Sequence, residues 1–246
     1  MDRSLYVAMS GAKQILQAQA SNSNNLSNAN TTGFRSDLQQ FRSMPVFGPG
    51  QPSRVYAMVE RPATDFSPGA IQTTGRNLDV TVKGDGWIAV QSPDGSEAYT
   101  RAGDFRLTPE GLLQTGSGLP VIGNGGPIAV PPAQKLEIGE DGTISVVPLG
   151  QPSNTLAIVD QIKLVDPPLD QLEKLKDGLM HLKGDRPAPI SSEVTLVSGA
   201  LESSNVNAID AMVRMIELAR QFEMQIKAMK SAFDNDAASA QLMRIG

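Results

Sequence analysis

The stretch "SNSNNLSNANTTGFRSD", which spans Ser21 to Asp37, marks the point at which the pattern of the chain changes. Before it, apolar residues recur at steps of three and four from Leu5 onward, as expected for one face of a helix. No Asp, Glu, Lys or Arg occurs from Gln14 to Phe34. Because a solvated helix normally carries charges on its outer face, we expect this helix to meet something other than water on most of its sides.

Five asparagines stand inside this stretch: Asn22, Asn24, Asn25, Asn28 and Asn30. One interpretation is a helix cap followed by a loop, because asparagine is common in both. The other is an interface with another chain, in which amides act as donors and acceptors without the desolvation cost of buried charges. The residues alone leave both interpretations open.

The C-terminal segment repeats the helical spacing more strongly than the N-terminal one. Asn207 followed by Asp210 resembles the capping box that begins a helix. We therefore predict two terminal helices that pair with each other through their apolar stripes. Large side chains are few in the first stripe, so a lone pair is marginal and packing among copies is expected. The stripes consist of Leu5, Ala8 or Met9, Ala12, Leu16, Gln19, Ser23 and Leu26, and of Val206, Ile209, Met212, Val213, Ile216, Ala219, Phe222, Ile226, Met229 and Phe233.

The middle of the chain is not helical, because all 17 prolines lie between Pro45 and Pro189. Alternating segments such as "LDVTVKGDGWIAVQ" predict strands, and "LEIGEDGTISVV" predicts a hairpin around Asp141-Gly142. The fold class is therefore α+β: paired long terminal helices, forming a coiled coil, with an inserted antiparallel β-rich domain. We expect Gly33 to end the first helix. The predicted segments are 1–33 and 203–246 for the helices, 34–72 and 184–202 for extended connections, and 73–183 for the β-rich domain.

Composition limits the classes of function. The chain has 246 residues, a formal net charge of −5 and no cysteine. The mild acidity argues against a nucleic-acid partner, and the lack of cysteine excludes disulfides and thiolate metal sites. No apolar run approaches the length of a membrane span, so no membrane insertion is expected. The N-terminus also lacks the apolar core of a cleaved secretory signal.

Candidate chemistry is weak throughout. The aspartates beside glycines, such as Asp85 and Asp94, fit turns better than a calcium loop or a catalytic pair. His181, the single histidine, has no second metal ligand or marked nucleophile, and a solvated loop position is expected for it. Trp87 is expected in the core, with surface recognition as the alternative. We predict no catalytic residue, no metal and no cofactor, so the protein is not expected to be an enzyme.

Several motifs nevertheless resemble one known family. "NNLSNANTTGFRSD", "GRNLDVTVKGDGWIAV", "YTRAGDFRLTPEGLLQTGSGLPVIG" and "SGALESSNVNAIDAMVRMIELARQFEMQIKAMKS" are similar to motifs of the bacterial flagellar rod and hook proteins. The match covers nearly the whole chain. The opening "MDRSLYVAMSGA", the short length and "RQFEMQIK" are most similar to the proximal-rod branch, and the distal-rod branch is the nearest alternative.

The resemblance implies a structural subunit that polymerises helically into a hollow drive shaft, which transmits torque and contains the export channel. It implies a rod in the periplasm, export through the flagellar type III apparatus without a cleaved signal, and other rod proteins and copies of itself as partners. Asparagines between Asn22 and Asn30 would then face either neighbouring subunits or the channel. The expected subunit interface consists of Leu5, Met9, Ala12, Leu16, Gln19, Asn22, Asn25, Leu26, Asn28, Thr31, Gly33, Phe34, Leu201, Glu202, Ser204, Asn205, Val206, Ile209, Met212, Val213, Ile216, Ala219, Phe222 and Ile226.

Two other classes of function stay open at this level. A carbohydrate-binding, adhesin-like β domain with helical oligomerisation ends would show Trp87 exposed in a groove. A hydrolase using the aspartates would show a cleft with two facing carboxylates.

Overall fold

The computed structural model describes residues 4–39, 41–45, 55–59, 63–151, 155–184 and 186–245. The chain divides into two compact units. The helical unit is formed by Met1–Ala29, Ser36–Asp65 and Val206–Gly246, and the β unit by Asn30–Arg35 and Phe66–Asn205. Both units are therefore assembled from segments far apart in the sequence, and the class is α+β with a helix at each end.

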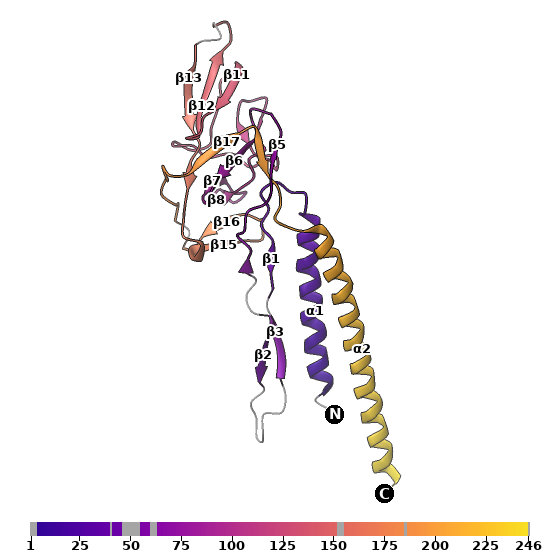
Figure 1. Cartoon of the computed structure of the whole chain (residues 1–246). Helices are drawn as coiled ribbons and strands as arrows, with labels where there is room; N and C mark the ends of the chain where they lie inside the picture. Colours follow the sequence, from indigo (N-terminus) through magenta and orange to yellow (C-terminus); the bar gives the residue numbers. More distant parts are fainter. Residues whose placement is uncertain are drawn as a thin grey trace. The chain divides into compact units, whose positions relative to one another are not determined.

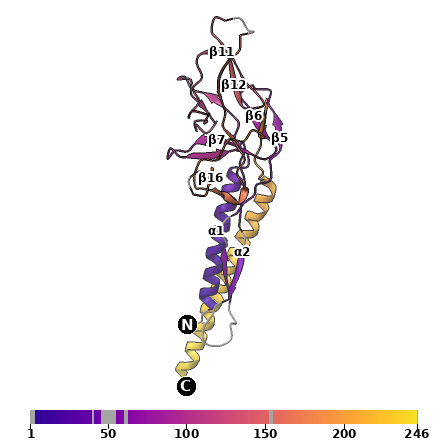
Figure 2. The same ribbon diagram turned by 90° about the vertical axis from the view of Figure 1, so that its left-hand side faces the viewer.

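Two helices dominate the helical unit, α1 (Ser4–Ser27) and α2 (Ala208–Ile245). They lie side by side in both Figure 1 and Figure 2. Their chains run in opposite directions, because Gly11 packs against Gln225 whereas the Asn22 Nδ2 donates to the Ala211 carbonyl at 2.7 Å. The facing side chains of α1 are small or medium-sized: Ala8, Ala12, Ile15 and Ala18 are buried.

The helix ends differ in how closely they follow the sequence signals. Asn207 caps α2 as predicted, since its Oδ1 accepts the backbone N–H groups of Ile209 at 3.0 Å and Asp210 at 3.4 Å. Helix α1 ends at Ser27, six residues before Gly33, so the prediction that Gly33 ends this helix is wrong. The last turn is closed instead by the Asn28 N–H, which donates to the carbonyls of Asn24 and Asn25.

Short strands complete the helical unit within the segment that we interpreted as an extended connection. Two antiparallel pairs form there, β1 with β4 and β2 with β3. Prolines and glycines cluster in the sequence between β2 and β3, and they obscure the alternation that would have indicated a hairpin. The strands are β1 (Asp37–Leu38), β2 (Phe41–Pro45), β3 (Val55–Val59) and β4 (Ala63–Thr64).

The β unit contains only antiparallel strand pairs among its described residues. A five-stranded sheet has the order β14-β7-β8-β16-β15. A three-stranded sheet has the order β11-β12-β13, and Figure 1 labels all three of its strands. Three further pairs are β10–β9, β17–β6 and β18–β5. The strands are β5 (Ile71–Thr73), β6 (Val80–Lys83), β7 (Trp87–Gln91), β8 (Glu97–Thr100), β9 (Arg106–Leu107), β10 (Leu113–Gln114), β11 (Ala133–Ile138), β12 (Thr143–Pro148), β13 (Ala157–Gln161), β14 (Leu164–Val165), β15 (Leu172–Lys174), β16 (Met180–Leu182), β17 (Thr195–Ser198) and β18 (Ala200–Glu202), and one 3₁₀ turn, η1, spans Leu169–Gln171.

The core of the β unit is organised around β7. Successive side chains of a strand point to opposite faces, so its continuous apolar run is buried on both sides. Ile88 and Val90 join the larger core cluster, whereas Trp87 and Ala89 join the smaller one. The predicted hairpin at Asp141-Gly142 is confirmed, because β11 and β12 pair across it. Trp87 is confirmed as a core residue, which removes the surface-recognition alternative.

Candidate assembly site

Helix α2 turns its larger apolar side chains away from α1. Ile209 is 73% exposed and Ile216 is 55% exposed, whereas Ala211 is buried and Leu218 is half-buried. At about 100° per residue, Ile209 and Ile216 lie on the opposite side of the helix from Ala211 and Leu218. The stripe that we predicted to pair with α1 therefore lies mainly on the outer face of α2.

The spacing rule failed here for a physical reason. Apolar residues occupy most of the circumference of α2, so steps of three and four fit more than one face. The face against α1 is decided by size, because the alanines of α1 and the glycine at position 11 bring the two helices close together. A Cβ atom at Gly11 would lie only 3.1 Å from the Gln225 side chain.

The expected interface residues fall into three groups by exposure in the single chain. Exposed are Met9, Leu16, Thr31, Ile209, Met212, Val213, Ile216, Ala219 and Ile226. Half-buried are Leu5, Gln19, Asn25, Leu26, Asn28, Phe34, Leu201, Asn205, Val206 and Phe222. Buried are Ala12, Asn22, Gly33, Glu202 and Ser204.

Several asparagines of the opening stretch make hydrogen bonds inside the chain. Asn25 holds Asp37 by two bonds: its Nδ2 donates to the Asp37 carbonyl, and its Oδ1 accepts the Asp37 N–H, both at 2.9 Å. Asn28 donates from Nδ2 to the Asn24 carbonyl. These amides therefore fix the end of α1 and the chain that follows it, whereas the side chain of Asn24 is exposed.

A buried ionic cluster lies where the chain enters and leaves the β unit. Glu202 is 2% exposed, and its Oε1 lies 2.5 Å from Arg35 Nη1 while its Oε2 lies 3.2 Å from Arg101 Nη1. The Gly69 N–H donates to the same Oε1 at 2.9 Å. Both guanidinium groups also face the Trp87 ring, at 5.9 and 5.4 Å from its centroid. We call Arg35, Arg101, Glu202 and Trp87 the Glu202 cluster.

The positive and negative charges of the Glu202 cluster do not balance, because two guanidinium groups share one carboxylate. Burial lowers the pKa of Arg101 below its ordinary value, although the charge of Glu202 acts in the opposite direction. Arg101 also donates from Nη2 to the Gly84 carbonyl at 2.8 Å. No spacing rule connects positions 35, 101 and 202, so the sequence offered no signal for this cluster.

Gly33 has its function at this cluster rather than at the helix end. Its φ is +66°, and a Cβ atom there would lie 2.3 Å from the Arg101 carbonyl carbon. Its N–H donates to the Glu202 carbonyl at 2.8 Å, and the Asn205 N–H donates to the Phe34 carbonyl at 3.3 Å. The incoming and outgoing segments of the β unit are thus joined directly.

His181 is not the solvated loop residue that we expected. It lies in β16, is buried, and its Nε2 is 2.8 Å from Asp177 Oδ2. The Ser92 hydroxyl donates to the same oxygen at 3.0 Å. Burial alone would raise the pKa of Asp177, but the hydrogen bonds from His181, the Leu179 N–H and Ser92 hold it below its ordinary value. The serine contacts the carboxylate and not the imidazole, so this is no nucleophile–base pair.

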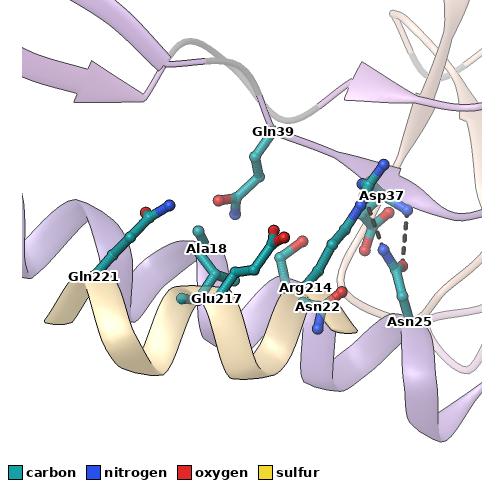
Figure 3. A pocket seen from close by; sticks show the side chains of 10 residues that line it. Ala18, Asn22, Asn25, Asp37, Gln39, Arg214, Glu217 and Gln221 are labelled. Atoms are coloured by element: carbon teal, nitrogen blue, oxygen red, sulfur yellow. Dashed lines mark hydrogen bonds between the residues drawn. The ribbon is translucent and has the colours of Figure 1, made fainter. Parts of the chain in front are cut away.

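A polar pocket of about 250 Å³ lies within the helical unit, and Figure 3 shows its labelled side chains. Arg214 and Glu217 line it from α2, and Gln39 lines it from the chain after β1. Within the described residues, no group of three or more His, Asp or Glu side chains is arranged to hold a metal ion. Of the described helices, none has both the length and the apolar character needed to cross a bilayer.

Comparison with known proteins defines the class of this protein. Three family models match in chain order: "Flagella basal body rod protein" at residues 5–35, "Flagellar hook protein FlgE/F/G D1 domain" at 81–146 and "Flagellar basal body rod FlgEFG protein C-terminal" at 197–242. The outer two cover most of α1 and α2, and the middle one covers β7 to most of β12. These matches describe a structural subunit of the flagellar rod, not an enzyme.

Full-length relatives identify the branch. The flagellar basal-body rod protein FlgF of Escherichia coli is 44% identical over 99% of both chains, and that of Salmonella typhimurium is 41% identical over 99% of both. FlgG of Bacillus subtilis is 32% identical over 92% of this chain and 94% of its own. The chain belongs to the FlgF family of flagellar basal-body rod proteins. The resemblance seen in the sequence is confirmed, and the adhesin and hydrolase alternatives are set aside.

Proposed function

We propose that the chain is a subunit of the proximal rod and that copies of it polymerise helically through α1 and α2, which form an inner coiled coil around the export channel. The rod lies in the periplasm and transmits torque. Its other partners are the neighbouring proximal-rod proteins below, the distal-rod protein above, and the type III export apparatus that delivers the chain without a cleaved signal.

The outer face of α2 carries this proposal. Exposed apolar patches on a soluble chain mark surfaces that another molecule covers. Ile209, Met212, Val213 and Ile216 form such a patch over about two turns, and they point away from α1. On α1, Met9 and Leu16 are also exposed. A single chain therefore leaves apolar surface on both helices, as a subunit of a larger helical bundle does.

Replacement of Ile216 by Asp tests this function. Because Ile216 is 55% exposed, the single chain should tolerate the change within about 0.5 kcal/mol. In an assembled rod the new carboxylate loses its water, at a cost of several kcal/mol. A loss of about 3 kcal/mol weakens a contact roughly 100-fold. A deletion strain producing I216D should therefore fail to swim in soft agar, while I216L swims normally.

Purified basal bodies provide the second readout. The wild-type chain and I216L should be present in them and I216D absent, although I216D is secreted. Full complementation by I216D would show that this face of α2 is not covered in the rod. Absence of the wild-type chain from basal bodies would overturn the rod assignment itself.

A further inference from the structure

One turn of the β unit contains the single Asn-Gly pair of the sequence, Asn124-Gly125. Both residues of the pair are exposed. The turn is closed on either side of them by the Gly123 N–H, which donates to the Gly126 carbonyl at 2.7 Å. Asn124 therefore lies in a short surface loop, where solvent reaches its side-chain amide.

The backbone nitrogen of Gly125 is free to react. Among the described residues, the Gly125 N–H donates no hydrogen bond. A Cβ atom at this glycine would meet nothing within 4 Å, so the space around the nitrogen is open. The Asn124 Cγ and the Gly125 nitrogen are close along the chain. A bond between them closes a small ring, a succinimide, and such a reaction gains from the proximity of its two groups.

The side chain of Asn124 is held only weakly in its present position. Its Nδ2 donates to the Gln161 Oε1 at 3.4 Å, which is long for a hydrogen bond of this kind. The Asn124 N–H lies equally far, 3.4 Å, from the Asp160 Oδ1. Rotation of the side chain toward Gly125 therefore costs little, and it brings Cγ to the backbone nitrogen.

Asp-Gly pairs can close the same ring, but three of the four in the sequence are held against it. In each of the three, the glycine N–H donates to the carbonyl three residues earlier. The aspartate side chain also accepts the N–H two residues later. Ring closure would have to break both hydrogen bonds. These pairs are Asp94-Gly95, Asp141-Gly142 and Asp177-Gly178.

We propose that Asn124 is a site of spontaneous covalent modification, at which its side-chain amide becomes a carboxylate without an enzyme. The Gly125 nitrogen bonds to the Asn124 Cγ, and its proton passes through solvent to Nδ2. The Cγ–Nδ2 bond breaks and Nδ2 leaves as ammonia. One water then hydrolyses the succinimide at either of its two carbonyl groups, which gives aspartate or isoaspartate at position 124.

The modification changes the turn in two ways. The new carboxylate replaces a donor that faces Gln161, and it adds negative charge beside Asp160. Isoaspartate also inserts a side-chain carbon into the main chain, within the turn that the bond from Gly123 to Gly126 closes. We therefore expect that bond to weaken. Chains that persist accumulate the acidic form, so its fraction increases with the age of the chain.

Incubation of the purified full chain in mildly alkaline buffer tests the proposal, with digestion and mass spectrometry of the peptides as readout. Asn124 should be converted at least about tenfold faster than any other asparagine, and two products should separate by chromatography. N124D supplies the reference for the aspartate product. The matched control is G125A, since the φ angle of Gly125 is not positive and an added Cβ meets no atom. Its methyl group shields the nitrogen, so conversion should be about tenfold slower or more.

The contribution of the fold is measured by incubating the same peptides after digestion. Asn124 should react within about threefold of the same rate in the folded chain and in its peptide, whereas Asp141 should isomerise about tenfold or more slowly in the folded chain. Conversion of Asn124 no faster than that of other asparagines, a wild-type rate for G125A, or equal protection of Asn124 and Asp141 by the fold would overturn the proposal. These rates do not depend on assembly into a rod.

Discussion

Replacing Glu202 by Gln removes the negative charge that faces two buried guanidinium groups while nearly preserving the shape of the side chain. Arg35 and Arg101 have 1% and 6% of their side chains exposed, so neither can turn to water. Removing one partner of a buried ion pair costs about 3–5 kcal/mol. Because domains are stable by only about 5–15 kcal/mol, E202Q should lose a large share of the stability of the β unit.

Urea unfolding of the full chain measures this loss. Trp87 is the single tryptophan and faces both guanidinium groups, so its fluorescence reports on the Glu202 cluster and on the unfolding of the β unit. With an m-value of about 3 kcal/mol per molar urea, the midpoint should fall by about 1–2 M. The control is E137Q, because Glu137 pairs with Lys135 at an exposed site where such pairs contribute about 0–1 kcal/mol. A loss for E202Q no greater than that for E137Q would refute the view that Glu202 compensates the buried cations.

Two further substitutions test features of the β unit. G33A should destabilise the chain more than G75A in thermal unfolding. Both glycines have positive φ, which costs alanine about 1–2 kcal/mol. Of these two positions, only at 33 would the added Cβ also collide with backbone atoms. D177N should lose hydrogen bonds to a charged group, about 1.5–3 kcal/mol. Because the folded pKa of Asp177 is below its ordinary value of 3.8, the stability gap to wild type should be complete above about pH 4 and close as the pH falls through the folded pKa. An unchanged gap at pH 2, or equal losses for the two glycine variants, would contradict these explanations.

The elements with local signals were predictable from the sequence. Period and capping indicated both helices, and the Asp141-Gly142 turn indicated its hairpin, because each signal lies within a few residues of the structure that it determines. The predicted bounds of 73–183 for a separate β-rich domain stay a prediction. In the structure, β17 and β18 follow position 183 in the sequence and pair with β6 and β5.

The site was less predictable, because its parts are distant in the sequence. Which face of α2 meets α1 depends on the small residues of another helix, not on the spacing within α2. A glycine at position 33 is a local sequence signal for positive φ. Nothing local predicts that Gly33 lies against Arg101, which is 68 positions further along the chain. The pocket at Gln39 depends in the same way on three segments that the fold brings together.

The unequal lengths of the two helices have a consequence for how such a polymer begins and ends. α2 has 38 residues and α1 has 24, and Gly11 is level with Gln225. The described start of α1, Ser4, is thus level with about position 232, and side chains from Phe233 to Gln241 are exposed. Roughly 15–20 Å of α2 thus extends past the described part of α1, and in the proposed rod we expect neighbouring molecules to cover it. A column of identical subunits leaves this overhang bare at one tip and the matching vacancy at the other. We therefore expect a different protein to cover each tip of such a column, so the unequal helix lengths bear on where this subunit type meets its neighbours.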